Sequence, residues 1–336
     1  MSHKPSTPSD RRTRVTVLVA LAANLVIAVA KAVGGLIAGS PALLSEAAHS
    51  VADSLNEVFL LAALRRSRRP ADSRHPFGYG KERFFWSLLA AVGIFVMGGC
   101  FSFYQGVDAL SSGSTETHDG YVVGLVVLVV ALFAEGASLL RALYQVRKQG
   151  GLAAGARDPA LRTVVAEDGT AVLGVTFAIV GMALHMVTGQ IVWEASASLA
   201  IGALLVYVAY RLGRDARDQL IGQAADVESS SRIRALLEAQ PEIDSVESLL
   251  TMQLGPDSTL VAARVDLVPG LDSEEVELVA VRIKRSVAHT IPEADQIFLD
   301  VTDAAIARRA AGTEHAGSRP GAHVGGPAAT GERGGA

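Results

Sequence analysis

The sequence contains one cysteine, few charged residues and no excess of basic charge. The lone cysteine, Cys100, excludes an intramolecular disulfide and a cysteine-rich zinc module. The formal net charge is -4, so the composition does not indicate a nucleic-acid partner. Charged residues make up 19% and hydrophobic residues 50% of the 336 residues, which is too apolar for an ordinary soluble domain. The composition therefore predicts a protein with several membrane spans and an attached soluble part.

Six apolar segments are long enough to cross a bilayer, which takes roughly 20 residues for each helix. We expect these spans at residues 15–38, 41–64, 84–109, 121–146, 161–187 and 191–211. The first segment superficially resembles a signal peptide. Its apolar run of about 24 residues is nearer a full span than the shorter core of a cleaved signal, so we interpret it as a retained helix.

The basic residues of the expected loops indicate the orientation of the spans. Lys and Arg are found before the first span and after the second, fourth and sixth, whereas the stretches GSPA, SSGSTETHDG and VTGQIV contain neither. By the positive-inside rule, both termini are cytoplasmic. We expect a multi-pass protein of the cell membrane, and the absence of a targeting extension favours a bacterial inner membrane.

Residues 215–306 have the pattern of a small soluble domain. The stretches SSRIRALLEAQ and SEEVELVAVRIKRSVAHT predict helices, and ESLLTMQL, TLVAARVDLV and DQIFLDV predict strands. The order α-β-β-α-β predicts a two-layer α+β domain of the ferredoxin-like type on the cytoplasmic side. The expected domains are a cytoplasmic tail at 1–14, the transmembrane region at 15–214, this domain at 215–306 and a disordered Gly/Ala-rich tail at 307–336.

The second expected span carries four ionisable side chains in otherwise apolar surroundings: Glu46, His49, Asp53 and Glu57. The last three are spaced four residues apart, so they form one polar stripe along a helix. An ionised side chain at mid-bilayer costs roughly 2.5–3.5 kcal/mol. The stripe is therefore expected to face a protein interior or a watery path.

The fifth expected span carries Glu167 and Asp168 at a similar depth. Counting about 1.5 Å per residue, Asp53 lies about 12 Å and Asp168 about 10 Å from the cytoplasmic edge of a core roughly 30 Å thick. An imidazole and carboxylates that converge at one depth are typical ligands of a divalent transition metal. We therefore predict a metal site formed by His49, Asp53 and Asp168. The alternative is a hydrogen-bonded network that only holds the helices together.

Several motifs combine along the chain to about residue 303: Asn24 and Lys31, GSPALLSEAAHSVADSLNE, HPFGYGKERF, EDGTAVLG and the α-β-β-α-β domain. This combination resembles the cation diffusion facilitator family of divalent metal transporters. The resemblance implies a homodimer with six spans per protomer, embedded in the lipid bilayer, that exports a divalent cation, usually zinc, in exchange for protons. The ligand positions of the family fall on His49, Asp53 and Asp168.

The fifth span departs from the usual pattern of that family, which has a histidine four residues before the aspartate. Val164 stands there and cannot bind a metal, and Glu167 flanks the vacant position. Glu167 either ligates the metal or carries protons or pairs with a basic residue. The chain resembles the branch of the family with an adjacent Glu-Asp pair. Replacing an imidazole by a carboxylate admits manganese, iron or cobalt as well as zinc.

Other family sites are reduced in this sequence. Asp72 and His75 match a second metal site of some members, but Tyr79 replaces another histidine, which favours a structural loop. His289 is alone among the predicted elements of the soluble domain, so this domain is expected to serve dimerisation. Glu46 and Glu57 either relay protons or pack between helices. We expect His118 and His185 to be solvated near the outer face.

The resulting hypothesis is proton-coupled efflux of a divalent cation by alternating access. Metal binding requires a neutral His49 and ionised Asp53 and Asp168, so loading from the cytoplasm releases protons. The competing interpretation is a non-transporting metal sensor or dimerising scaffold with the same fold. A membrane-embedded hydrolase is disfavoured because the sequence has no HExxH and no GxSxG motif, so we expect no enzyme activity.

Overall fold

The computed structural model describes residues 8–112, 118–148, 159–255 and 258–302. The chain divides into two compact units, one of Met1–Gln223 with Leu254–Pro256 and one of Ala224–Gln253 with Asp257–Ala336. The tail expected at 307–336 lies outside the described residues, as do the first residues of the N-terminal tail. The domain limits expected at 14, 214 and 306 stay predictions.

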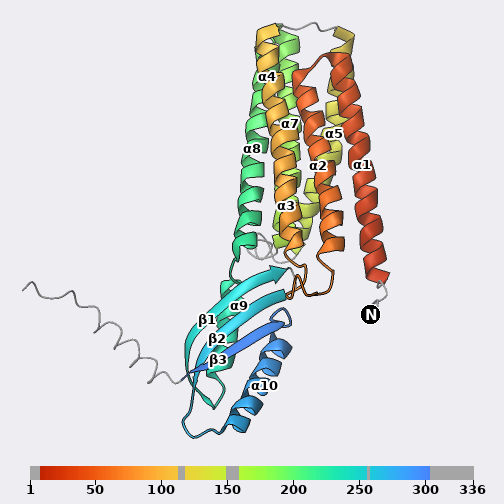
Figure 1. The fold of residues 1–336 in the computed structure, drawn as a ribbon. Helices are drawn as coiled ribbons and strands as arrows, with labels where there is room; N and C mark the ends of the chain where they lie inside the picture. The colour runs from red at the N-terminus through yellow and green to blue at the C-terminus, as the bar shows by residue number, and fades with distance from the viewer. Residues whose placement is uncertain (1–7, 113–117, 149–158, 256–257, 303–336) are drawn as a thin grey trace, which may run out of the picture. The chain divides into compact units, whose positions relative to one another are not determined.

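The first unit is a bundle of long helices that run side by side (Figure 1). In chain order they are α1 (Pro8–Ala38), α2 (Pro41–Arg66), α3 (Glu82–Gly93), η1 (Ile94–Cys100), α4 (Phe101–Ser112), α5 (His118–Lys148), α7 (Pro159–Thr188) and α8 (Val192–Ile221). The segments α3, η1 and α4 follow one another without a break, and η1 is wound as a π-helix.

Five helical stretches of the described residues are long and apolar enough to cross a membrane: Leu21–Ala38, Glu82–Ser112, Gly120–Lys148, Val165–Thr188 and Val192–Ile221. The helix α2 does not belong to this set, because the ionisable residues at its centre lower its hydropathy. The unit is therefore a helical, membrane-type domain with five apolar helices.

Local sequence explains where α2 begins and where α8 ends. The side chain of Ser40 accepts a hydrogen bond from the backbone N–H of Leu43 at the start of α2, and Pro41 occupies the first turn, where a missing N–H does no harm. The helix α8 continues past residue 211, where its expected span ends, and stops at Gly222 with φ +107°. Glycine adopts this left-handed conformation without strain, so it closes the helix.

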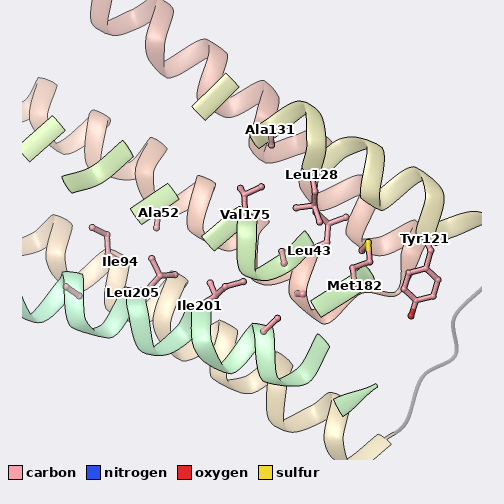
Figure 2. Close-up of a cluster of buried hydrophobic side chains, with 14 residues drawn as sticks. Leu43, Ala52, Ile94, Tyr121, Leu128, Ala131, Val175, Met182, Ile201 and Leu205 are labelled. Carbon is pink, nitrogen blue, oxygen red and sulfur yellow. The ribbon is translucent and has the colours of Figure 1, made fainter. Parts of the chain in front are cut away.

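One apolar core is formed by side chains from α2, α5, α7, α8 and the continuous stretch of α3, η1 and α4. Its fully buried members include Leu43, Leu128, Val175, Met182 and Ile201. Figure 2 shows these side chains pointing toward one another between the helices. A Cβ built on Gly98 would lie 2.8 Å from Leu205, so the absence of a side chain lets η1 approach α8 closely.

The second unit contains α9 (Val227–Glu238), β1 (Ile243–Gly255), β2 (Ser258–Leu267), α10 (Ser273–Thr290) and β3 (Gln296–Thr302). Its sheet has the order β1-β2-β3, and β2 runs parallel to β3 with Val261 opposite Ile297. Burial alternates along β2, the strand expected at TLVAARVDLV, because Val261 and Val265 are buried on the side of α9 and α10 whereas Arg264 is exposed. At the start of α10, Asp272 and Glu275 form a reciprocal capping box.

Candidate metal site

The helix α2 brings His49 and Asp53 together, as their four-residue spacing predicts. The Nε2 atom of His49 lies 3.6 Å from Oδ2 of Asp53, which is too long for a hydrogen bond. The His49 side chain is 5% exposed, whereas that of Asp53 is 38% exposed. Among the described residues, neither ring nitrogen of His49 has a hydrogen-bond partner. Buried polar atoms without partners are rare, so this imidazole has free coordinating capacity next to an acid.

The adjacent acids of α7 face different neighbours. Oδ2 of Asp168 accepts a hydrogen bond of 2.8 Å from the hydroxyl of Ser138 on α5. Oε1 of Glu167 accepts one of 3.2 Å from the side-chain amide of Asn56 on α2. The side chain of Val164, whose position lacks the family's histidine, lies outside the described residues.

The predicted ligands have different direct contacts in the structure. No group of three or more His, Cys, Asp and Glu side chains in the described part of the chain is arranged to hold a metal ion. His49 and Asp53 are neighbours on α2, and Asp168 accepts a hydrogen bond from Ser138. The set of His49, Asp53, Asp168 and Glu167 therefore stays a prediction.

Glu46 belongs to a buried charge cluster that joins three helices. The ammonium group of Lys31 on α1 lies 3.0 Å from Oε2 of Glu46 on α2 and 2.7 Å from Oε1 of Glu135 on α5. Lys31 also donates a hydrogen bond of 3.0 Å to the hydroxyl of Ser50. Sequence reasoning did not single out Glu135, although a lone glutamate inside an apolar span is the signal that marks it.

Glu57 continues the polar stripe of α2 but is directed toward α1. Its Oε1 atom accepts a hydrogen bond of 2.8 Å from the side-chain amide of Asn24. Both acids that were considered as proton relays thus have partners on α1, Glu46 with Lys31 and Glu57 with Asn24. The relay role stays a prediction.

The loop between α2 and α3 uses Asp72 within its own structure. Oδ1 of Asp72 accepts hydrogen bonds from the backbone N–H groups of Arg74 and His75, and Oδ2 accepts one of 2.7 Å from the hydroxyl of Tyr79. The hydrogen bond from Tyr79, helped by those from the backbone, holds the pKa of Asp72 below its ordinary value. The same bond raises the pKa of Tyr79. The weak second metal site of Asp72 and His75 and the favoured structural loop both stay predictions.

The expectation that His185 is solvated was wrong. His185 is only 6% exposed to solvent. Its Nδ1 atom lies 2.9 Å from Oε1 of Glu194 and 2.9 Å from the hydroxyl of Tyr121. Glu194 follows nine residues later on α8 and Tyr121 lies 64 residues earlier on α5, so a pattern along one helix does not reveal these partners. The side chain of His118 lies outside the described residues, and His289 is exposed in the last turn of α10.

Comparison with known proteins adds a family relationship. Residues 17–221 match the family model of the cation efflux transmembrane domain. The chain is 33% identical over 266 residues to metal tolerance protein C4 of Arabidopsis thaliana, covering 77% of this chain and 58% of that protein. It is 32% identical over 258 residues to the mitochondrial proton-coupled zinc antiporter SLC30A9 of Xenopus laevis, covering 74% and 46%. The chain thus spans only about half the length of these two relatives.

A bacterial relative is covered over most of its length. The cation-efflux pump FieF of Serratia proteamaculans is 28% identical over 292 residues, which cover 86% of this chain and 92% of the pump. The similarity therefore extends beyond the transmembrane segment that the family model matches.

Proposed function

The chain belongs to the cation efflux family, and on this basis we propose that it exports a divalent metal ion from the cytoplasm. The observation that carries the proposal is the buried imidazole of His49, which has no hydrogen-bond partner among the described residues and lies beside Asp53 on α2. A neutral imidazole next to a carboxylate offers the nitrogen and oxygen ligands that transition metals bind.

The proposal requires α2 to cross the membrane as a sixth span beside the five apolar helices. Two contacts support this crossing, because Glu46 is paired with Lys31 and Glu57 accepts a hydrogen bond from Asn24. Ionisable groups are tolerated in membrane helices when they face partners inside the bundle. With an even number of spans, both termini lie in the cytoplasm, as the basic loops indicate. We place the protein in the cell membrane as a homodimer.

The proposed metal ligands are His49 and Asp53 on α2 and Asp168 on α7, with Glu167 as a further candidate. In the structure, Glu167 already contacts α2 through Asn56, whereas Asp168 is bonded to Ser138. Binding of the ion then exchanges the bond from Ser138 for a bond to metal and brings α7 toward His49. The Glu-Asp pair supports placing the chain in the corresponding branch of the family.

Transport is proposed to be coupled to protons. A metal ion binds neutral imidazole and ionised carboxylates, so loading on the cytoplasmic side releases protons and reprotonation on the outer side expels the ion. The relative from Xenopus laevis is named a proton-coupled zinc antiporter, which supports zinc as the substrate. A site richer in carboxylate oxygen also accepts manganese, iron or cobalt.

The test is metal uptake by the purified full-length chain in liposomes that contain a pH dye and a metal-sensitive dye. Zinc, manganese, iron and cobalt are supplied in turn, and Asp53→Asn and Asp168→Asn are compared with the parent chain. We expect each substitution to abolish metal uptake and the linked proton flux. The matched control is Asp108→Asn, an exposed acid on α4 that should leave flux unchanged.

The possible outcomes test the assigned metal ligands and the transport function separately. Uptake that persists in Asp53→Asn or Asp168→Asn would contradict the assigned ligands. A parent chain that binds zinc but transports none of the four metals would instead favour the sensor or scaffold interpretation.

A further inference from the structure

Four side chains that the metal site does not use form a buried polar cluster at one end of the helical bundle. They come from the beginning of α2, the first turn of α5, the last turn of α7 and the first turn of α8: Ser40, Tyr121, His185 and Glu194. Ser40 and Glu194 are completely buried. Since this end holds the turns between α1 and α2 and between α7 and α8, it is the outer end in the proposed orientation.

Glu194 is the centre of this cluster, because both of its carboxylate oxygens are occupied. Oε1 lies 2.9 Å from Nδ1 of His185, and Oε2 accepts a hydrogen bond from the hydroxyl of Ser40. The hydroxyl of Ser40 in turn accepts the backbone N–H of Leu43. One carboxylate thus links the first turn of α2 to the last turn of α7.

The two linked helices are the ones that carry the proposed metal ligands. Ser40 lies about 20 Å from Asp53 along α2, and His185 lies about 25 Å from Asp168 along α7, at about 1.5 Å per residue. Glu194 is therefore too distant to bind the same ion. It holds the far ends of both helices.

An apolar layer lies between the cluster and the metal site. Leu43, Ala178 and Met182 are completely buried, and Figure 2 shows Tyr121 at one end of this layer, next to Met182. An ion cannot pass such a layer while the outer ends of α2 and α7 remain together. Separating them exposes the layer and breaks the contacts of Glu194.

We propose that Glu194 is a positioning residue that keeps the outer ends of α2 and α7 together while the metal site is open to the cytoplasm. This inference rests on the proposed transport function. A buried hydrogen bond is costly to break because the freed polar groups lose their partners, so the link favours the outward-closed state until the helices separate. Weakening the link shifts the population toward the outward-open state.

The test measures how fast a cysteine inside the apolar layer reacts with a membrane-impermeant thiol reagent added from the outer side. The reporter is Ala178→Cys in a full-length chain in which Cys100→Ser removes the native thiol. Glu194→Ala should accelerate labelling by about tenfold, the effect of losing a buried hydrogen bond. Glu194→Gln should restore part of the protection, because an amide retains one acceptor.

Two further variants keep the test decisive. Ser40→Ala removes only the link to α2 and should also accelerate labelling. This variant therefore tests the role of the link even if Glu194→Ala does not fold. The matched control is Ser198→Ala, one turn from Glu194 on α8. Its hydroxyl lies 2.5 Å from that of Ser45 and donates a hydrogen bond to the backbone carbonyl of Ser102, so labelling should stay at the parent rate.

Labelling requires no metal, so it remains informative if transport itself is not found. In the flux assay, Glu194→Ala should raise the apparent KM for cytoplasmic metal more than it lowers kcat, because fewer molecules present the cytoplasm-open site. Parent-like labelling in both Ser40→Ala and folded Glu194→Ala would overturn the proposal. Equal acceleration by Ser198→Ala would overturn it as well.

Discussion

The ammonium group of Lys31 lies 3.0 Å from Oε2 of Glu46, and neither side chain is exposed to solvent. A second carboxylate, Glu135, lies 2.7 Å from the same ammonium group. One ammonium group therefore forms ion pairs with two acids that come from different helices. Because buried ions are costly without partners, this cluster fixes α1, α2 and α5 relative to one another.

Lys31→Met is expected to destabilise the helical unit. The substitution leaves Glu46 and Glu135 buried without their cation, a change that typically costs about 3–5 kcal/mol. The measurement is thermal unfolding of the full chain in detergent, followed by the loss of helical signal. Adding Glu46→Gln and Glu135→Gln to Lys31→Met should recover much of the loss, because the remaining groups are then neutral. An unchanged Tm in Lys31→Met would contradict the role of the cluster.

Two glycines of α7 offer a matched pair of substitutions. A Cβ on Gly174 would overlap Oε1 of Glu46, whereas a Cβ on Gly169 would meet nothing within 4 Å. Gly174→Ala is therefore expected to lower stability by about 1–3 kcal/mol through overpacking against the Lys31 cluster. Gly169→Ala should be neutral or stabilising by up to about 1 kcal/mol, because alanine favours the helix. Equal Tm values for the two variants would refute this assignment.

Glu167→Gln tests whether the acid beside Asp168 contributes to the metal site. If Glu167 joins the coordination sphere, the variant should bind zinc about tenfold more weakly. The measurement is a competition titration with a zinc-chelating dye in detergent. Glu57→Gln is the control, since Glu57 is bonded to Asn24 on α1, and the affinity of this variant for zinc should stay at that of the parent chain. A parent-like affinity in Glu167→Gln would remove this residue from the coordination sphere.

Tyr79→Phe is expected to raise the pKa of Asp72 toward its ordinary value, because the hydroxyl is the main cause of the depressed pKa. A depressed folded-state pKa means that the loop contacts of Asp72 stabilise the protein above the unfolded-state pKa and are lost as the pH falls through the folded-state pKa. The variant should therefore lose these contacts at a higher pH. An NMR titration of the labelled carboxyl group measures the shift. Tyr104→Phe, at an exposed tyrosine of α4, should leave the titration of Asp72 unchanged.

Hydrophobic runs predicted the main elements well. Pro41 begins α2 as expected, and α10 covers Ser273–Thr290, the stretch that the sequence predicted as a helix. The end of α8 was not predictable in this way, because RLGRDARDQLI is polar yet helical. Hydropathy reports burial in lipid or protein, whereas the hydrogen bonds of a helix continue until a residue such as Gly222 ends it.

In the candidate site, contacts within one helix could be predicted from the sequence, whereas contacts between helices could not. The proximity of His49 and Asp53 follows from one turn of a helix. The rotation of α7, which points Asp168 at Ser138, depends on how helices pack, and spacing along one helix does not contain it. The pairing of Glu194 with His185 likewise depends on the packing of α8 against α7.

The π-helix η1 accommodates one residue more than an α-helix would need between α3 and α4. Loss of one residue within Ile94–Cys100 would let this segment rewind as an ordinary α-helix while the inner and outer sides of α3 and α4 keep their directions. The same loss early in α2 or α7 would rotate every later side chain by about 100° and turn Asp53 or Asp168 away from the bundle. We therefore expect the loss of one residue to be tolerated in η1. The same loss early in α2 or α7 should disrupt the proposed metal site.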